Sequence, residues 1–113
     1  MHEMSLAEGV LGVVQDAARA YAPCTVSAVW LEIGALAAVE NEALRFAFEV
    51  VKRGSVAEGA LLEIVEVPGV AWCMQCSRSV QIGERGAPCP DCGSYQLQVT
   101  GGDAMRVKEL ELA

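Results

Sequence analysis

Four cysteines in two close pairs are the residues of this chain with the clearest chemistry. The pairs are Cys73-Met-Gln-Cys76 and Cys89-Pro-Asp-Cys92, with twelve residues between them. A gap of two residues lets both sulfurs of a pair reach one ion from a single turn of backbone. Two such pairs supply the four soft ligands of a closed structural site, so the spacing predicts a tetrahedral Zn²⁺.

Two disulfides, or four buried free thiols, are the alternatives for this quartet. No signal peptide begins the sequence, so we expect the protein in the cytoplasm, where disulfides are rare and zinc is favoured. The fifth cysteine, Cys24, has no partner at a two-residue spacing. We expect it to be a small buried side chain beside a strand.

The N-terminus offers a second candidate metal site, built from nitrogen ligands. The only histidine, His2, follows Met1 directly. The terminal amine, the imidazole and the backbone amide between them can reach one metal, and such ligands suit Ni²⁺ or Cu²⁺. Glu3 and Glu40 can add a further ligand. The alternatives are an exposed terminal histidine without a metal and a plain carboxylate at the start of a helix.

Composition excludes several other classes of function. The chain has 113 residues, of which 53% are hydrophobic, enough for a core, but no apolar run has the length of a membrane span. Eight basic and 15 acidic residues give a net charge of −7. A nucleic-acid partner is therefore disfavoured, because phosphate contacts need a basic surface.

Two helices are predicted from apolar residues that recur at spacings of three and four. The first covers residues 4–20 and the second residues 40–53. The expected buried stripe of the first helix is Leu6, Val10, Val13, Val14 and Ala17. The expected buried face of the second helix is Leu44, Ala47, Phe48 and Val51, widened by Phe46 and Val50.

Three strands are predicted at residues 25–33, 60–67 and 105–112, from alternating or β-branched composition. The expected fold is therefore α+β: a two-layer domain of a three-stranded sheet with two helices, made of residues 1–68 and 104–113. Residues 69–103 form an inserted zinc-ribbon-like domain, since helical periodicity disappears there and glycines and cysteines gather. Val80 and Ile82 are expected on a short ribbon between the cysteine pairs.

Several segments together resemble the HypA/HybF family of hydrogenase nickel-incorporation proteins. They are the start Met1-His2-Glu3-Met4-Ser5-Leu6, the segments Val29-Trp-Leu-Glu-Ile-Gly34 and Phe48-Glu-Val-Val-Lys-Arg-Gly-Ser55, and the cysteine quartet. The resemblance extends over essentially the whole chain. The Met-His-Glu start is short by itself, but it is specific when joined to the quartet in a chain of this length.

The resemblance implies a nickel metallochaperone. Such a protein helps to insert Ni²⁺ into the precursor of the [NiFe]-hydrogenase large subunit, together with a HypB-type GTPase, and some relatives serve urease. It implies that Ni²⁺ is held by the Met1 amine, His2 and the Glu3 backbone, with Glu40 as an additional ligand. It also places Zn²⁺ on Cys73, Cys76, Cys89 and Cys92.

Other functional classes fit the sequence less well. A zinc-ribbon module that binds proteins or nucleic acid is the main alternative, although only Arg78 and Arg85 supply positive charge near the cysteines. A zinc enzyme is disfavoured because four cysteines leave no open coordination position. No Gly-Lys-Ser phosphate loop is present, so we expect no nucleotide hydrolysis. The only histidine lies at the terminus, so a Ser-His pair is not expected either, and we predict that the protein is not an enzyme. A homodimer is compatible with the sequence.

Overall fold

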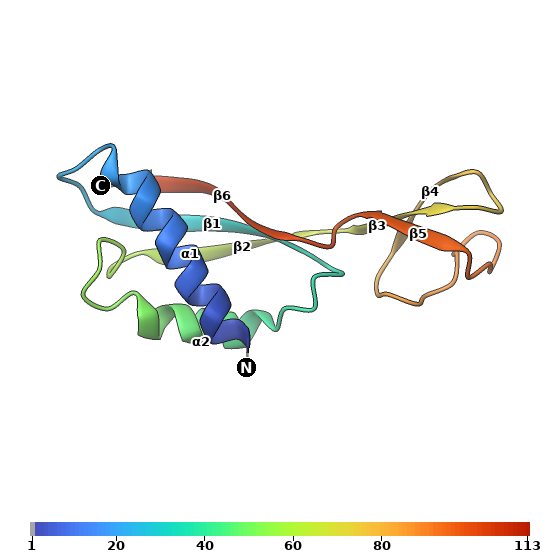
Figure 1. Cartoon of the computed structure of the whole chain (residues 1–113), viewed down its shortest axis with the longest axis horizontal. Helices are drawn as coiled ribbons and strands as arrows, with labels where there is room; N and C mark the ends of the chain where they lie inside the picture. Colours follow the sequence, from blue (N-terminus) through green and yellow to red (C-terminus); the bar gives the residue numbers. More distant parts are fainter. Residues whose placement is uncertain (1) are drawn as a thin grey trace. The chain divides into compact units, whose positions relative to one another are not determined.

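Two helices and six strands occur in the computed structural model, which describes residues 2–113. The chain divides into two units (Figure 1). The helical unit contains the described part of Met1–Leu31 together with Val39–Val65 and Arg106–Ala113. The cysteine unit contains Glu32–Ala38 and Glu66–Met105.

The helical unit is built on a sheet with the strand order β2-β1-β6. The strands are β1 (Val26–Gly34), β2 (Leu61–Val67) and β6 (Met105–Leu112). Helix α2 (Asn41–Val51) connects β1 to its neighbour β2, and α1 (His2–Arg19) packs against α2. Because α2 joins two adjacent strands, it lies on one face of their sheet, and α1 packs against it. The predicted α+β fold is confirmed.

The interior of the helical unit combines one face of each helix with β1. Val29 and Leu31 of β1 are fully buried, as are Leu44 and Phe48 of α2, which have at most 1% of their surface exposed. The predicted buried face of α2 is confirmed for these two residues and Ala47. The prediction that Phe46 and Val50 widen it is wrong, because they are 70% and 36% exposed.

The buried stripe of α1 also differs from the prediction. Its buried residues are Ala7, Val10, Val14 and Ala18. Val13 is 52% exposed and Ala17 is exposed, contrary to expectation. Apolar and small residues occur all round this helix, so several stripes fit a period of 3.6. The stripe with two alanines lets α1 lie close to its neighbours.

The second helix begins and ends with interactions that its sequence explains. Glu40 is the N-cap residue, and its carboxylate accepts a hydrogen bond from the Glu42 amide at 3.3 Å. At the other end Lys52 is buried, and its Nζ donates to Ala60 O at 2.9 Å and to Glu49 Oε1 at 3.0 Å. Gly54, with φ of +76°, reverses the chain direction after the helix.

The cysteine unit contains an antiparallel sheet with the order β4-β3-β5. Its strands are β3 (Gly69–Cys73), β4 (Arg78–Ile82) and β5 (Leu97–Gly101). Val80 and Ile82 lie on β4, so the predicted ribbon is confirmed, whereas β3 and β5 were not predicted. A small core of six buried residues supports the sheet: Leu36, Ala71, Cys73, Val80, Ile82 and Cys89.

Glycines are required where the chain enters and leaves the cysteine unit. A Cβ on Gly34 would collide with the carbonyl of Gly102, and one on Gly102 would collide with the carbonyl of Pro68. Gly102 also has a φ of +73°, which disfavours any other residue. Among the described residues, no helix has the length and apolar character needed to cross a membrane.

Candidate metal centre

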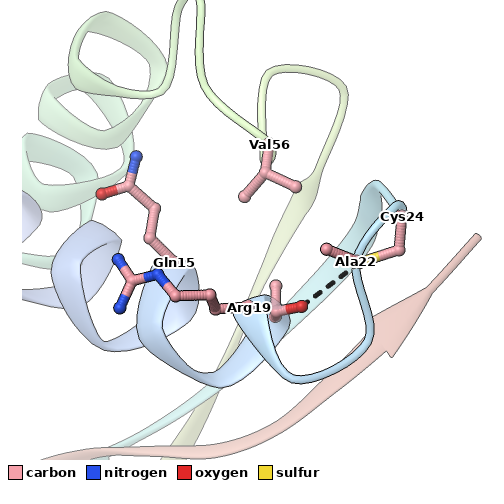
Figure 2. Close-up of a pocket in the computed structure, with 6 residues that line it drawn as sticks. Gln15, Arg19, Ala22, Cys24 and Val56 are labelled. Atoms are coloured by element: carbon pink, nitrogen blue, oxygen red, sulfur yellow. Dashed lines mark hydrogen bonds between the residues drawn. The ribbon is translucent and has the colours of Figure 1, made fainter.

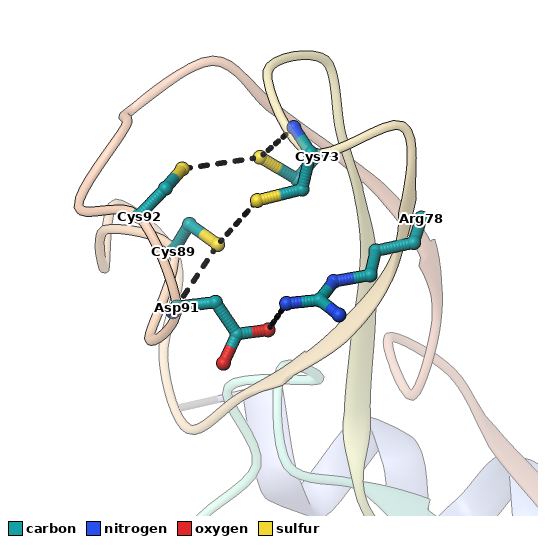
Figure 3. Close-up of polar contacts among 6 residues, drawn as sticks. Cys73, Arg78, Cys89, Asp91 and Cys92 are labelled. Carbon is teal, nitrogen blue, oxygen red and sulfur yellow. Dashed lines mark hydrogen bonds and ion pairs between the residues drawn. The ribbon is translucent and has the colours of Figure 1, made fainter.

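The four cysteine sulfurs lie together at one end of the sheet β4-β3-β5 (Figure 3). The Sγ atoms of Cys73 and Cys92 are 3.7 Å apart, those of Cys76 and Cys89 are 3.9 Å apart, and all four lie within 4.8 Å of one another. Zn–S bonds of about 2.3 Å in a tetrahedron place the sulfurs roughly 3.8 Å apart. The quartet therefore has the size of a tetrahedral thiolate site.

The two cysteine pairs form similar tight turns. In the first, the Cys76 amide donates to Cys73 Sγ at 3.3 Å, and the Ser77 amide donates to Cys73 O at 2.8 Å. In the second, the Asp91 amide donates to Cys89 Sγ at 3.4 Å, and the Gly93 amide donates to Cys89 O at 2.8 Å. Amide hydrogens that point at sulfur stabilise thiolates, which are the form that binds metal.

Both turns end in the left-handed backbone region. The residue four positions after the first cysteine is Ser77 in one turn, with φ of +53°, and Gly93 in the other, with φ of +77°. Glycine adopts this conformation without steric cost, whereas serine does not. Gly93 is therefore well suited to its turn, whereas the matching bend at Ser77 has no signal in the sequence.

The four cysteines of the quartet differ in burial and in the pKa of their thiols. Cys73 and Cys89 are buried, Cys76 is half-buried and Cys92 is exposed. Burial raises the pKa of Cys89, but the amides of Cys92 and Asp91 outweigh it and lower the pKa to about 7. The thiol of Cys92, followed by burial, raises the pKa of Cys76 to about 12. Four thiolates this close need a cation to balance their charge, and the four sulfurs form a site for that cation.

An ion pair connects the two turns beside the sulfurs. Arg78 begins β4 directly after the first turn, and its guanidinium lies 2.6 Å from the carboxylate of Asp91 in the second turn (Figure 3). Both side chains are about half exposed, so the pair contributes little to stability. The ion pair joins the two cysteine turns and so helps to fix their relative position. The sequence did not predict this contact.

The predicted nitrogen site lies at the start of α1. Met1 lies outside the described residues. The His2 side chain is 58% exposed, and its Nε2 is 3.6 Å from the Glu3 carboxylate. That carboxylate accepts a hydrogen bond from the Glu40 amide at 3.3 Å, which lowers the pKa of Glu3, with His2 acting in the same direction. The structure thus brings His2, Glu3 and Glu40 together.

Side chains alone do not complete a metal site at this position. Within residues 2–113, only the cysteine quartet brings three or more side-chain ligands within reach of one ion. The Glu40 carboxylate is engaged with the Glu42 amide at the start of α2. A metal held at His2 would therefore need ligands other than three side chains of residues 2–113.

A shallow hollow of about 290 Å³ lies beside the end of α1 and is lined by Arg19, Cys24 and Val56, among others (Figure 2). Cys24 is half-buried, and its thiol donates to Ala18 O at 3.5 Å. This cysteine lies outside the quartet and behaves as a packing residue with a weak hydrogen bond.

Comparison with known proteins agrees with this arrangement. A family model described as "Hydrogenase/urease nickel incorporation, metallochaperone, hypA" matches residues 1–112. The chain is 60% identical over 112 residues to hydrogenase maturation factor HypA 2 of Bradyrhizobium diazoefficiens, and 62% identical to hydrogenase maturation factor HypA of Azotobacter chroococcum. Each comparison covers 99% of both chains.

Solved structures show the same fold. The solution structure of the Ni metallochaperone HypA from Helicobacter pylori has a TM-score of 0.71 and 26% sequence identity, covering 99% of this chain and 97% of that one. A second solution structure, of HypA protein, has a TM-score of 0.73. The fold is thus that of a solved metallochaperone, a class of metal carriers, and a four-cysteine site accompanies it here. Within that class, this chain belongs to the HypA family.

Proposed function

We propose that this protein carries Ni²⁺ for hydrogenase maturation, holding it at the N-terminus, and that Zn²⁺ in the cysteine quartet fixes the cysteine unit. The observation that carries the proposal is the exposed His2 at the start of a helix, in a chain that matches a nickel-incorporation family along residues 1–112. The closed cysteine quartet suits an ion that stays bound, whereas the exposed His2 suits an ion that is passed on.

Zinc is the metal best suited to the quartet. Four thiolates in a tetrahedron with no open position are typical of structural Zn²⁺. The core of the cysteine unit has six buried residues, two of which, Cys73 and Cys89, belong to the quartet. So small a core needs a metal for stability, and the free energy of zinc binding is then free energy of folding. Zinc would hold the unit in one shape without taking part in chemistry.

Nickel is suited to the nitrogen atoms at the start of α1. The ligands that we propose are the Met1 amine, the His2 imidazole and the backbone amides of His2 and Glu3. The first N–H groups of an α-helix have no carbonyl partner within the helix, and α1 begins at His2. A metal can therefore use these amide nitrogens without breaking helical hydrogen bonds.

Glu3 and Glu40 have different roles in this proposal. The Glu3 carboxylate accepts from the Glu40 amide, so it holds the start of α1 against the start of α2. Glu40 as a further nickel ligand remains a prediction. The Glu42 amide holds Oε1 of the Glu40 carboxylate over the start of α2, which leaves only Oε2 for a metal and restricts its direction. We therefore expect Glu40 to add little to nickel affinity.

Transfer of nickel is ligand exchange between proteins. With its imidazole 58% exposed, His2 is accessible to the ligands of an acceptor. We propose that the acceptor is the precursor of the hydrogenase large subunit in the cytoplasm, and that a HypB-type GTPase takes part in the transfer. No chemical conversion of a substrate is required, in agreement with a family described as metallochaperones.

Nickel titration of the zinc-loaded protein with a native N-terminus tests this function. We expect one Ni²⁺ per chain, and loss of that binding in His2→Ala and in a chain extended before Met1. The matched control is the same extension placed after Ala113, which should leave nickel binding intact. Zinc should remain at one ion per chain throughout. Nickel binding that survives both N-terminal changes would exclude the terminal site.

A further inference from the structure

One carboxylate oxygen lies between the imidazole of His2 and the first turn of α2. Oε2 of Glu3 is 3.6 Å from Nε2 of His2, and it accepts a hydrogen bond of 3.3 Å from the amide of Glu40. His2 and Glu3 are the first two residues of α1, and Glu40 is the N-cap residue of α2. A single side chain therefore links the candidate nickel ligand to the start of the second helix.

The exposure of the two side chains shows which of them is the anchor. The Glu3 side chain is only 13% exposed, whereas that of His2 is 58% exposed. A carboxylate is rarely withdrawn from water unless it is paired or hydrogen-bonded. Here the Glu40 amide holds it at the positive end of α2. The Glu3 carboxylate is thus a fixed acceptor, and the exposed imidazole can adjust to it.

The two ring nitrogens of His2 have different tasks at the candidate nickel site. In the proposed function, on which this inference rests, backbone nitrogen atoms and His2 hold the metal. Nδ1 is the ring nitrogen on the backbone side, and it can close a small chelate ring together with the amide nitrogen of His2. Nε2 lies on the far side of the ring, where it faces Oε2 of Glu3.

The position of one proton decides whether Nδ1 can bind a metal. A neutral imidazole carries a proton on one nitrogen, and only the other nitrogen has a free lone pair. A carboxylate that accepts from Nε2–H keeps the proton on Nε2 and leaves Nδ1 free. A small rotation of the exposed His2 ring would shorten the contact of 3.6 Å to a hydrogen bond of about 2.8 Å.

We propose that Glu3 is a positioning residue for nickel: its carboxylate, anchored by the Glu40 amide, accepts from Nε2–H of His2 and so presents Nδ1 to the metal. The carboxylate is then not itself a ligand. A metal on Nδ1 and an acceptor on Nε2 lie roughly 6–7 Å apart across the ring, which is too far for one carboxylate to contact both. Glu3 acts on nickel only through the orientation and the proton of His2.

The state of the ring can be measured without nickel. His2 is the only histidine of the chain, so a sample labelled with ¹⁵N-histidine reports on this ring alone. We expect zinc-loaded protein with a native N-terminus, at about pH 8.5 where an imidazole is neutral, to have a protonated Nε2 and an unprotonated Nδ1. In Glu3→Ala both ¹⁵N shifts should move toward those of histidine in an unstructured peptide.

Nickel titration of the same samples measures the effect on affinity. Loss of the hydrogen-bond partner of a metal-binding histidine weakens metal binding by about 10–100-fold, and at this exposed site we expect about tenfold for Glu3→Ala. Glu3→Gln keeps an oxygen that can accept from Nε2–H, so its loss should stay below about threefold. Glu8→Ala is the matched control, because it removes an exposed carboxylate from the same helix. It should leave the ¹⁵N shifts and the nickel affinity as in wild type.

The outcomes separate this proposal from the proposed function. Glu3→Ala that binds nickel as tightly as wild type, or that leaves the ¹⁵N shifts unchanged, would overturn the proposal, while loss of nickel in His2→Ala would still support the terminal site. Glu3→Gln as weak as Glu3→Ala would also overturn it, because the carboxylate would then act as a direct ligand. Nickel binding that is unchanged in His2→Ala would refute the proposed function, and the role of Glu3 with it.

Discussion

The left-handed residues that end the two cysteine turns make a quantitative prediction about zinc affinity. Gly93 has a φ of +77°, and a Cβ built there meets no atom within 4 Å. Gly93→Ala therefore adds no collision, and its cost comes from the backbone alone. For an L-residue that cost is roughly 1–2 kcal/mol. Under the proposed coupling of zinc binding to folding of the cysteine unit, zinc affinity should fall by about 5–30-fold.

Ser77 allows the opposite test. Its φ is +53°, in the left-handed region. Ser77→Gly should relieve the backbone cost, partly offset by the greater freedom of glycine in the unfolded chain. The net gain of about 0.5–1 kcal/mol corresponds to zinc binding that is about two- to fivefold tighter.

Competition for zinc against a chromophoric chelator measures all of these variants. Gly83→Ala is the matched control, since Gly83 lies in the same unit, has open space around its Cβ position and does not have a left-handed φ. It should bind zinc as wild type does. The reasoning would be refuted if Gly93→Ala behaved like Gly83→Ala, or if Ser77→Gly weakened zinc binding.

Three further predictions concern stability. Lys52→Met should lower the free energy of unfolding by about 1–3 kcal/mol in urea titrations, because the carbonyl of Ala60 loses its buried donor, while exposed Arg53→Met should change it little. Gly102→Ala should lower the free energy of unfolding by at least about 2 kcal/mol in the same titrations, more than Gly93→Ala does. The reason is that a collision with the Pro68 carbonyl adds to the cost of a φ of +73°. Equal losses in the two variants would contradict this. Cys73→Ser should abolish zinc binding and the amide NMR dispersion of the cysteine unit, while signals from α1 and α2 persist; loss of all dispersed signals would show that the units do not fold separately.

Local signals in the sequence predicted much of the structure. The spacing of Cys73, Cys76, Cys89 and Cys92 predicted a quartet whose sulfurs do lie within 4.8 Å of one another. The last strand was predicted with its observed bounds, 105–112, because charged and apolar residues alternate through it. Such patterns report on backbone geometry directly, so they survive without knowledge of the tertiary fold.

Features that depend on tertiary contacts were not predictable. The choice of Ala7 and Ala18 over Val13 and Ala17 in α1 depends on how closely the helix approaches the sheet and α2. The strand β3 was missed because its five residues, Gly69–Cys73, were assigned to the metal-binding segment. The contact of Arg78 with Asp91 joins residues that become neighbours only once both turns have formed.

The candidate nickel site shows the same division. The sequence singled out His2 and Glu3, and the structure adds that the Glu3 carboxylate is held by the Glu40 amide. It also shows the Glu40 side chain engaged in capping α2, a role that a carboxylate at a helix start always allows. The proposed nickel ligands include backbone nitrogen atoms. The pattern of side chains in the sequence carries no information on these atoms.

The most direct test of the assignment of the two metals is X-ray absorption at the zinc and nickel edges. It uses the untagged protein loaded with both metals. The account predicts one zinc surrounded by four sulfur atoms and one nickel surrounded by nitrogen and oxygen atoms alone. Sulfur in the nickel shell, or a zinc shell with fewer than four sulfur atoms, would contradict it.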